Sequence, residues 1–96
     1  VWGIDLDAEA LAIARGRATE LPNTAFVHGD AADLSRAPGP FDAVTCRWGL
    51  ASFADPRAVL REAARRAAPG AVLVVAVWGP LADCAWSHLP REGYFP

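Results

Sequence analysis

Short apolar runs alternate with helix-like segments along the chain. The runs at residues 41–46 and 71–78 are apolar on both faces, which is typical of parallel strands covered by helices on each side. Shorter runs at residues 1–4 and 24–28 predict two further strands. Apolar side chains then recur at helical spacing over residues 8–18, with the stripe continuing to Leu21, as follows: Leu11, Ala14, Ala18 and Leu21.

A second helix is predicted between the last two strands. Asp55 and Pro56 are a helix start, with an acid at the N-cap and proline at the first helical position. Pro69 and Gly70 end it. The buried stripe is expected at Leu60, Ala63, Ala64 and Ala67, and the water-facing side at Arg57, Arg61, Arg65 and Arg66.

The order of elements is therefore strand–helix–strand, followed by a second strand–helix–strand. This alternation predicts an α/β fold with a parallel sheet and right-handed crossovers. Residues 1–80 form the expected core. Residues 81–96 lose the pattern and are expected to be an irregular tail with a helical turn near Trp86.

Composition excludes several classes of protein. The 96 residues suit one small domain, and 53% apolar with 21% charged residues is a globular composition. A net charge of −2 offers no basic surface for nucleic acid or an anionic membrane. No apolar run is long enough to span a bilayer, and the first residues lack the basic region and apolar core expected of a signal peptide. Two cysteines make neither a disulfide framework nor a metal-binding spacing, so no metal is expected and the cytoplasm is the default location.

Two carboxylates follow predicted strands. Asp5 ends the first strand, where nucleotide-binding α/β folds hold ribose hydroxyls, and a carboxylate can accept both hydrogen bonds of a vicinal diol. Asp30 follows the second strand and could accept a hydrogen bond from an adenine amino group. The alternatives are structural: Asp5 as a helix cap, a role that Asp7 could also fill, and Asp30 as an ordinary turn acid.

Other polar residues are less informative. Arg47 and Trp48 follow the third strand and could line a ligand cleft; the alternative is a surface arginine with Trp48 packed under the loop, which is slightly favoured for Trp48. Cys46 fits a small buried apolar group. Neither His28 nor His88 has a nucleophile or metal-ligand partner at useful spacing, and no residue stands out as a general base.

These segments resemble class I S-adenosylmethionine-dependent methyltransferases, and most closely the ubiquinone/menaquinone-type small-molecule methyltransferases. The first 15 residues resemble their second-strand segment, VWGIDLDAEALAIAR. Residues 26–34 are similar to the third-strand loop, FVHGDAADL, and residues 41–78 to the region from the fourth strand to the fifth, FDAVTCRWGLASFADPRAVLREAARRAAPGAVLVVAVW. The resemblance covers residues 1 to about 80 and implies a Rossmann-like parallel sheet with helices on both faces.

The resemblance also implies a cofactor, S-adenosyl-L-methionine, and a small-molecule methyl acceptor. Asp5 would bind the ribose hydroxyls and Leu6 would touch the adenine. Asp30 would meet the adenine amino group, with a backbone contact from Ala31. Cys46 and Arg47 would lie near the methionine part and the acceptor.

The chain departs from the family in three places. The glycine-rich loop that follows the family's first strand would precede Val1, and the strands that close the sheet are absent. The usual Pro-Gly-Gly is Pro69-Gly70-Ala71 here. We therefore expect a fragment with four strands that is weakly active or inactive alone. Because the family's first strand lies between its second and fourth, either the two strand pairs close up directly or the chain needs the missing sequence to fold.

Two other functions are consistent with the residues. A nicotinamide-dependent oxidoreductase shares the acid at the strand end, but needs a glycine-rich fingerprint before it. A truncated domain that is not catalytic would also fit. The Asp-Pro helix start and the Pro-Gly turn favour methyl transfer.

Overall fold

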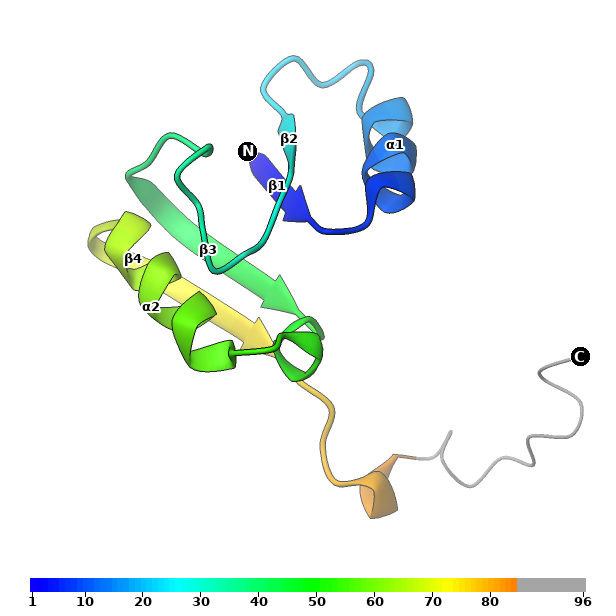
Figure 1. Cartoon of the computed structure of the whole chain (residues 1–96), viewed down its shortest axis with the longest axis vertical. Helices are drawn as coiled ribbons and strands as arrows, with labels where there is room; N and C mark the ends of the chain where they lie inside the picture. The colour runs from blue at the N-terminus through cyan, green and yellow to red at the C-terminus, as the bar shows by residue number, and fades with distance from the viewer. Residues whose placement is uncertain (85–96) are drawn as a thin grey trace, which may run out of the picture.

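The computed structural model describes residues 1–84. This part of the chain forms four strands and two α-helices, and Figure 1 shows how they are arranged. Two short 3₁₀ turns accompany them. In chain order, the elements are β1 (Trp2–Asp5), α1 (Ala8–Arg17), β2 (Ala25–His28), β3 (Phe41–Arg47), a turn (Leu50–Ser52), α2 (Pro56–Arg66), β4 (Ala67–Ala76) and a turn (Leu81–Asp83). The helical turn expected near Trp86, and His88, lie outside the described residues.

The strands form two parallel pairs. β1 pairs with β2, with Trp2 opposite Ala25 and Asp5 opposite His28. β3 pairs with β4, with Arg47 opposite Ala76 at its end. The predicted α/β class with parallel strands is confirmed, and α1 and α2 lie on opposite sides of the molecule (Figure 1).

The two pairs do not join into one sheet. Within residues 1–84, β1 is paired with β2 alone and β3 with β4 alone. The expectation that the pairs close up directly is therefore wrong. Its alternative, that the chain needs further sequence to fold, stays a prediction. Residues of β1 and β3 line the cleft described below, which lies between the two pairs.

Helix α1 begins where the sequence predicts. The Asp7 carboxylate accepts hydrogen bonds from the backbone N–H groups of Glu9 and Ala10, at 2.9 and 3.1 Å, and so caps the first turn. Leu11 is buried against the first strand pair. Leu21 is 52% exposed, contrary to the predicted stripe, because the helix ends at Arg17 and the chain no longer turns with helical period.

Helix α2 also begins as predicted, with the Asp55 carboxylate accepting the Ala58 N–H at 3.0 Å and Pro56 at the first position. Its end differs from the prediction. Ala67 already pairs with Phe41, so the helix stops at Arg66 and β4 starts four residues early. The Pro-Gly segment makes an irregularity within β4, where Gly70 adopts a φ of +80° that favours glycine.

The buried face of α2 is rotated from the predicted one. Val59, Glu62 and Ala63 are buried, whereas Ala64 is exposed and Leu60 is half-buried. Arg57, Arg61 and Arg65 face water as expected, but Arg66 folds back to Glu62. The core beside α2 therefore contains a carboxylate that the sequence pattern did not single out.

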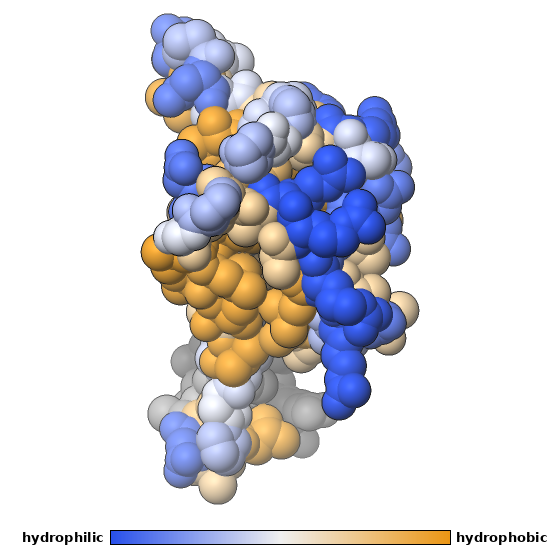
Figure 2. Space-filling view, turned by 90° about the vertical axis from the view of Figure 1, so that its left-hand side faces the viewer, coloured by the Kyte–Doolittle hydropathy of each residue, from blue (hydrophilic) through white to orange (hydrophobic). Residues whose placement is uncertain are grey.

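The second strand pair is not covered on both faces. In this part of the chain, exposed apolar side chains gather on β4 and the residues that follow it: Val72, Leu73, Val74, Val77 and Trp78. Figure 2 shows a broad apolar area beside a strongly polar strip on the side of the molecule where α2 and β4 lie. Because successive side chains of a strand point to opposite faces, β4 leaves apolar surface exposed on both faces within residues 1–84.

Candidate functional site

Asp5 and Asp30 lie at the same edge of the first strand pair. β1 and β2 are parallel and in register, so Asp5 lies opposite His28, and Asp30 follows His28 by two residues. Both carboxylates are exposed. The carboxyl ends of parallel strands are where open α/β sheets bind ligands, and both carboxylates lie at that edge.

Asp5 is not the cap of α1. Its Oδ1 accepts the backbone N–H of Asp7 at 2.9 Å, which stabilises the turn ahead of the helix, while Asp7 caps the helix itself. A carboxylate has about four acceptor positions, so this single bond leaves capacity for a ligand. The neighbouring Leu6 side chain is 64% exposed and lines the same cleft as Asp5.

The backbone around Leu6 is held from the second strand. His28 Nε2 lies 2.8 Å from the carbonyl oxygen of Leu6, so the imidazole ties β2 to the β1–α1 turn. This structural role of His28 was not predicted from the sequence. The sequence signal that could have indicated it is the position of His28 at the end of a strand predicted to pair with the strand of Asp5.

Asp30 is part of a tight turn, as its structural alternative proposed. Its Oδ1 accepts the Ala32 N–H at 2.8 Å, and its carbonyl accepts the Asp33 N–H at 3.0 Å. Ala31 is half-buried between them. The turn fixes the backbone of Asp30 and leaves the carboxylate exposed at the edge of the sheet.

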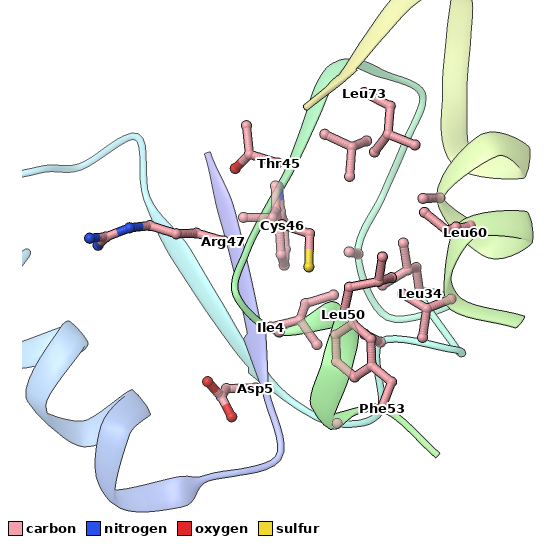
Figure 3. A pocket seen from close by; sticks show the side chains of 18 of the residues that line it. Ile4, Asp5, Leu34, Thr45, Cys46, Arg47, Leu50, Phe53, Leu60 and Leu73 are labelled. Carbon is pink, nitrogen blue, oxygen red and sulfur yellow. The ribbon is translucent and has the colours of Figure 1, made fainter. Parts of the chain in front are cut away.

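A cleft of about 740 Å³ lies between the two strand pairs. Its lining includes five of the six residues expected at the cofactor, namely Asp5, Leu6, Ala31, Cys46 and Arg47, but not Asp30. Figure 3 shows an apolar wall of leucines and Phe53 on one side, with Asp5 and Arg47 both extending away from that wall. The volume falls within the range of small-molecule sites, roughly 300–1,000 Å³.

Arg47 and two tryptophans form a stack at the carboxyl ends of β3 and β4. The Arg47 Cζ lies 3.8 Å from the centroid of the Trp48 ring. Trp48 in turn stacks on Trp78, with centroids 4.9 Å apart and planes 8° from parallel. Trp48 has a φ of 60°, a strained value for a bulky residue, and its N–H donates to Ala76 O at 2.7 Å. The sequence did not predict the stack, although the β3–β4 register implies it.

Glu62 is the second feature that sequence reasoning missed. Its carboxylate accepts the Leu34 N–H at 3.1 Å and the Arg66 Nε–H at 3.0 Å, and lies 3.3 Å from Arg65 Nε. The Arg66 guanidinium, assisted by the Leu34 N–H and by Arg65, holds the pKa of Glu62 below its ordinary value. An ionised carboxylate therefore joins α2 to the loop that carries Asp30.

Residues 1–84 contain neither a side-chain cluster suited to a metal ion nor a helix able to span a membrane. That part of the chain has no cluster of three or more His, Cys, Asp or Glu side chains suited to a metal ion. Neither of its α-helices is long and apolar enough to cross a membrane.

Comparisons with known proteins agree with the resemblance noted in the sequence. The family described as a methyltransferase domain matches residues 1–75. A demethylmenaquinone methyltransferase of Mycolicibacterium vanbaalenii is 43% identical over 74 residues, which are 77% of this chain and 31% of that protein. One from Mycolicibacterium paratuberculosis is 35% identical over 91 residues, 95% of this chain and 38% of that protein.

A third relative is named for a different quinone. The 2-phytyl-1,4-naphtoquinone methyltransferase of Thermosynechococcus vestitus is 39% identical over 70 residues, 73% of this chain and 31% of that protein. No solved structure matches the chain. The chain thus spans about a third of the length of the curated relatives it matches. Because the family match covers most of the chain and its strands and helices follow the expected order, this chain belongs to the methyltransferase domain family, in the class I quinone-type subgroup.

Proposed function

We propose that this chain supplies the adenosine-binding part of an S-adenosylmethionine-dependent methyltransferase that acts on a small-molecule acceptor. The single observation that carries the proposal is the pair of exposed carboxylates, Asp5 and Asp30, at the ends of two neighbouring parallel strands. The helix cap is already made by Asp7, so capping does not account for Asp5.

The residues present fit the cofactor in chemical terms. The Asp5 carboxylate can accept two hydrogen bonds from the vicinal hydroxyls of a ribose. The exposed Leu6 side chain beside it offers an apolar surface to an adenine ring. By the family resemblance, Asp30 and Ala31 would meet the exocyclic amino group of the adenine; Ala31 lines the cleft, and Asp30 lies exposed beside it.

The chemistry supplied by the bound cofactor is a methyl group on a positively charged sulfur, open to in-line attack by a nucleophilic O, N or C atom. The residues described here bind and orient. Proximity and orientation can lower such a barrier by roughly 7–11 kcal/mol, and no residue at the cleft is an evident general base. Cys46 and Arg47 line the same cleft from β3, and the Arg47 guanidinium offers a bidentate partner for a carboxylate such as that of the methionine part.

The names of the relatives support a quinone-type acceptor, since two are demethylmenaquinone methyltransferases and the third is a 2-phytyl-1,4-naphtoquinone methyltransferase. We propose the same broad class for the protein to which these residues contribute, in the cytoplasm. The family match favours methyl transfer over the hydride transfer of a nicotinamide enzyme. A non-catalytic role is the remaining alternative for the 96 residues alone.

The test is calorimetric titration of the purified chain with S-adenosylhomocysteine, the demethylated product. We expect binding by the wild type and its loss in Asp5→Ala. Asp42→Ala is the matched control, because Asp42 is an exposed carboxylate near the amino end of β3, away from the ligand-binding edge. A folded chain that does not bind, or Asp42→Ala matching Asp5→Ala, would overturn the proposal that these residues form the adenosine site.

A further inference from the structure

The 29–37 loop, which joins β2 to β3, carries the Asp30 turn and also crosses from one strand pair to the other. Two of its apolar residues are buried: Leu34 is 8% exposed and Ala37 is 1% exposed. On the facing side, Val59 and Ala63 of α2 are buried as well, and all four line the same cleft wall. Apolar packing therefore holds the loop near α2, but such contacts are non-directional and do not set its register.

A directional contact is made by Glu62. Its carboxylate is nearly buried, with a side chain 9% exposed, and it accepts the Leu34 N–H across 28 residues of sequence. Two arginines of the same helix, Arg65 and Arg66, orient that carboxylate. This hydrogen bond is 3.1 Å long and its acceptor is an ionised carboxylate, so the contact favours one position of the Leu34 backbone against α2.

Hydrogen-bonded turns connect Leu34 to Asp30. The Asp33 N–H donates to the carbonyl of Asp30, and the Ala32 N–H donates to the Asp30 carboxylate. On the other side of the loop, the Arg36 guanidinium donates to the carbonyl of His28 at 2.9 Å. Hydrogen bonds therefore connect the segment from His28 to Leu34 at several points, so a shift of Leu34 should be felt at Asp30.

From these contacts we infer that Glu62 is a positioning residue for the cofactor site, which through Leu34 holds Asp30 in place relative to Cys46 and Arg47. The inference rests on the proposed function, because it names the residue that sets the distance between the adenosine side of the cleft and the β3 side. Glu62 lies on the helix of the second strand pair, whereas Asp30 follows the first pair. It links the two halves of the site that the sheets themselves leave unpaired.

The test compares Glu62→Ala with Glu62→Gln in the 96-residue chain. Alanine removes the acceptor, while the glutamine amide oxygen can still accept the Leu34 N–H. We expect Glu62→Ala to accelerate hydrogen exchange of the Leu34 amide and to weaken S-adenosylhomocysteine binding, each by about tenfold. Glu62→Gln should restore both to within about threefold of wild type. Arg61→Ala is the control, since Arg61 is a largely exposed residue of the same helix that reaches toward Asp55 and not the loop.

A double-mutant cycle separates positioning from general stability. If Glu62 acts through Asp30, then Glu62→Ala should weaken binding little further in an Asp30→Ala background, but should keep its full effect in an Asp5→Asn background. Additive effects in both backgrounds, or unchanged exchange at Leu34, would overturn the inference. If the folded wild-type chain does not bind S-adenosylhomocysteine, the proposed function fails, and the exchange rate of the Leu34 amide still decides whether Glu62 holds the loop.

Discussion

Asp5 and Asp7 are two residues apart and differ in what they bond, so their substitution by alanine should have opposite consequences in two assays. Asp7 accepts two backbone N–H groups of α1, and losing an N-cap of this kind destabilises a protein by about 1 kcal/mol. An unfolding entropy of about 2.1 cal/mol/K per residue, over 96 residues, is about 0.2 kcal/mol/K. Asp7→Ala should therefore lower Tm by about 5 °C.

Asp5→Ala removes one exposed hydrogen bond, to the Asp7 N–H, and should lower Tm by no more than about 2 °C. In binding the order reverses: Asp5→Ala should abolish detectable affinity for S-adenosylhomocysteine, and Asp7→Ala should keep it within about threefold at a temperature where both are folded. Thermal unfolding followed by circular dichroism and calorimetric titration measure the two quantities. Equal losses of Tm in the two variants would refute the division of roles, because Asp5 would then be a structural acid like Asp7.

Three further substitutions test the backbone and the buried carboxylate. Gly70→Ala should destabilise by roughly 1–2 kcal/mol in urea unfolding, because its φ of +80° disfavours a side chain although a Cβ there would meet no atom within 4 Å. Gly16→Ala should stabilise by about 0.5–1 kcal/mol, since Gly16 lies within α1 and a Cβ would again meet nothing; a loss of stability there would contradict this. The pKa of Glu62 is lowered in the folded chain, so its contribution to stability is present above the unfolded pKa and lost as pH falls through the folded one. Wild type should thus lose more stability than Glu62→Gln below roughly pH 4, whereas parallel acid-unfolding curves would show that the Glu62 charge contributes nothing.

The elements that the sequence predicted well are those with a local physical signal. Asp55-Pro56 begins a helix because an acid accepts free N–H groups and proline has none to lose, and both facts are independent of the rest of the fold. The parallel pairing followed from strands separated by helices, which cannot form a tight hairpin. The placement of Asp5 and Asp30 at one edge is a consequence of that pairing.

The buried face of α2 could not be predicted from the local sequence pattern. Alanines and larger apolar residues occupy both the row through Val59 and Ala63 and the row through Leu60 and Ala64, so helical period alone does not choose between them. The choice is made by the 29–37 loop, which brings a backbone N–H to Glu62 and apolar side chains to the first row. A glutamate in an arginine-rich helix is ordinarily a solvated residue, and its burial could be foreseen only from a loop contact 28 residues away.

The same distinction between local and long-range information applies to the candidate site. Each half is built from neighbouring residues: the Asp5 turn by Asp7, the Asp30 turn by Ala32 and Asp33, and the end of β3 by its register with β4. The relation between the halves has no such local basis, because no strand pairing joins them within residues 1–84. The resemblance to the wider family expects a strand in that gap. Within residues 1–84, the Glu62–Leu34 hydrogen bond is a directional contact from α2 to the Asp30 loop. A substitution at Glu62 should therefore alter the geometry of the site more than a substitution at an exposed residue of the same helix.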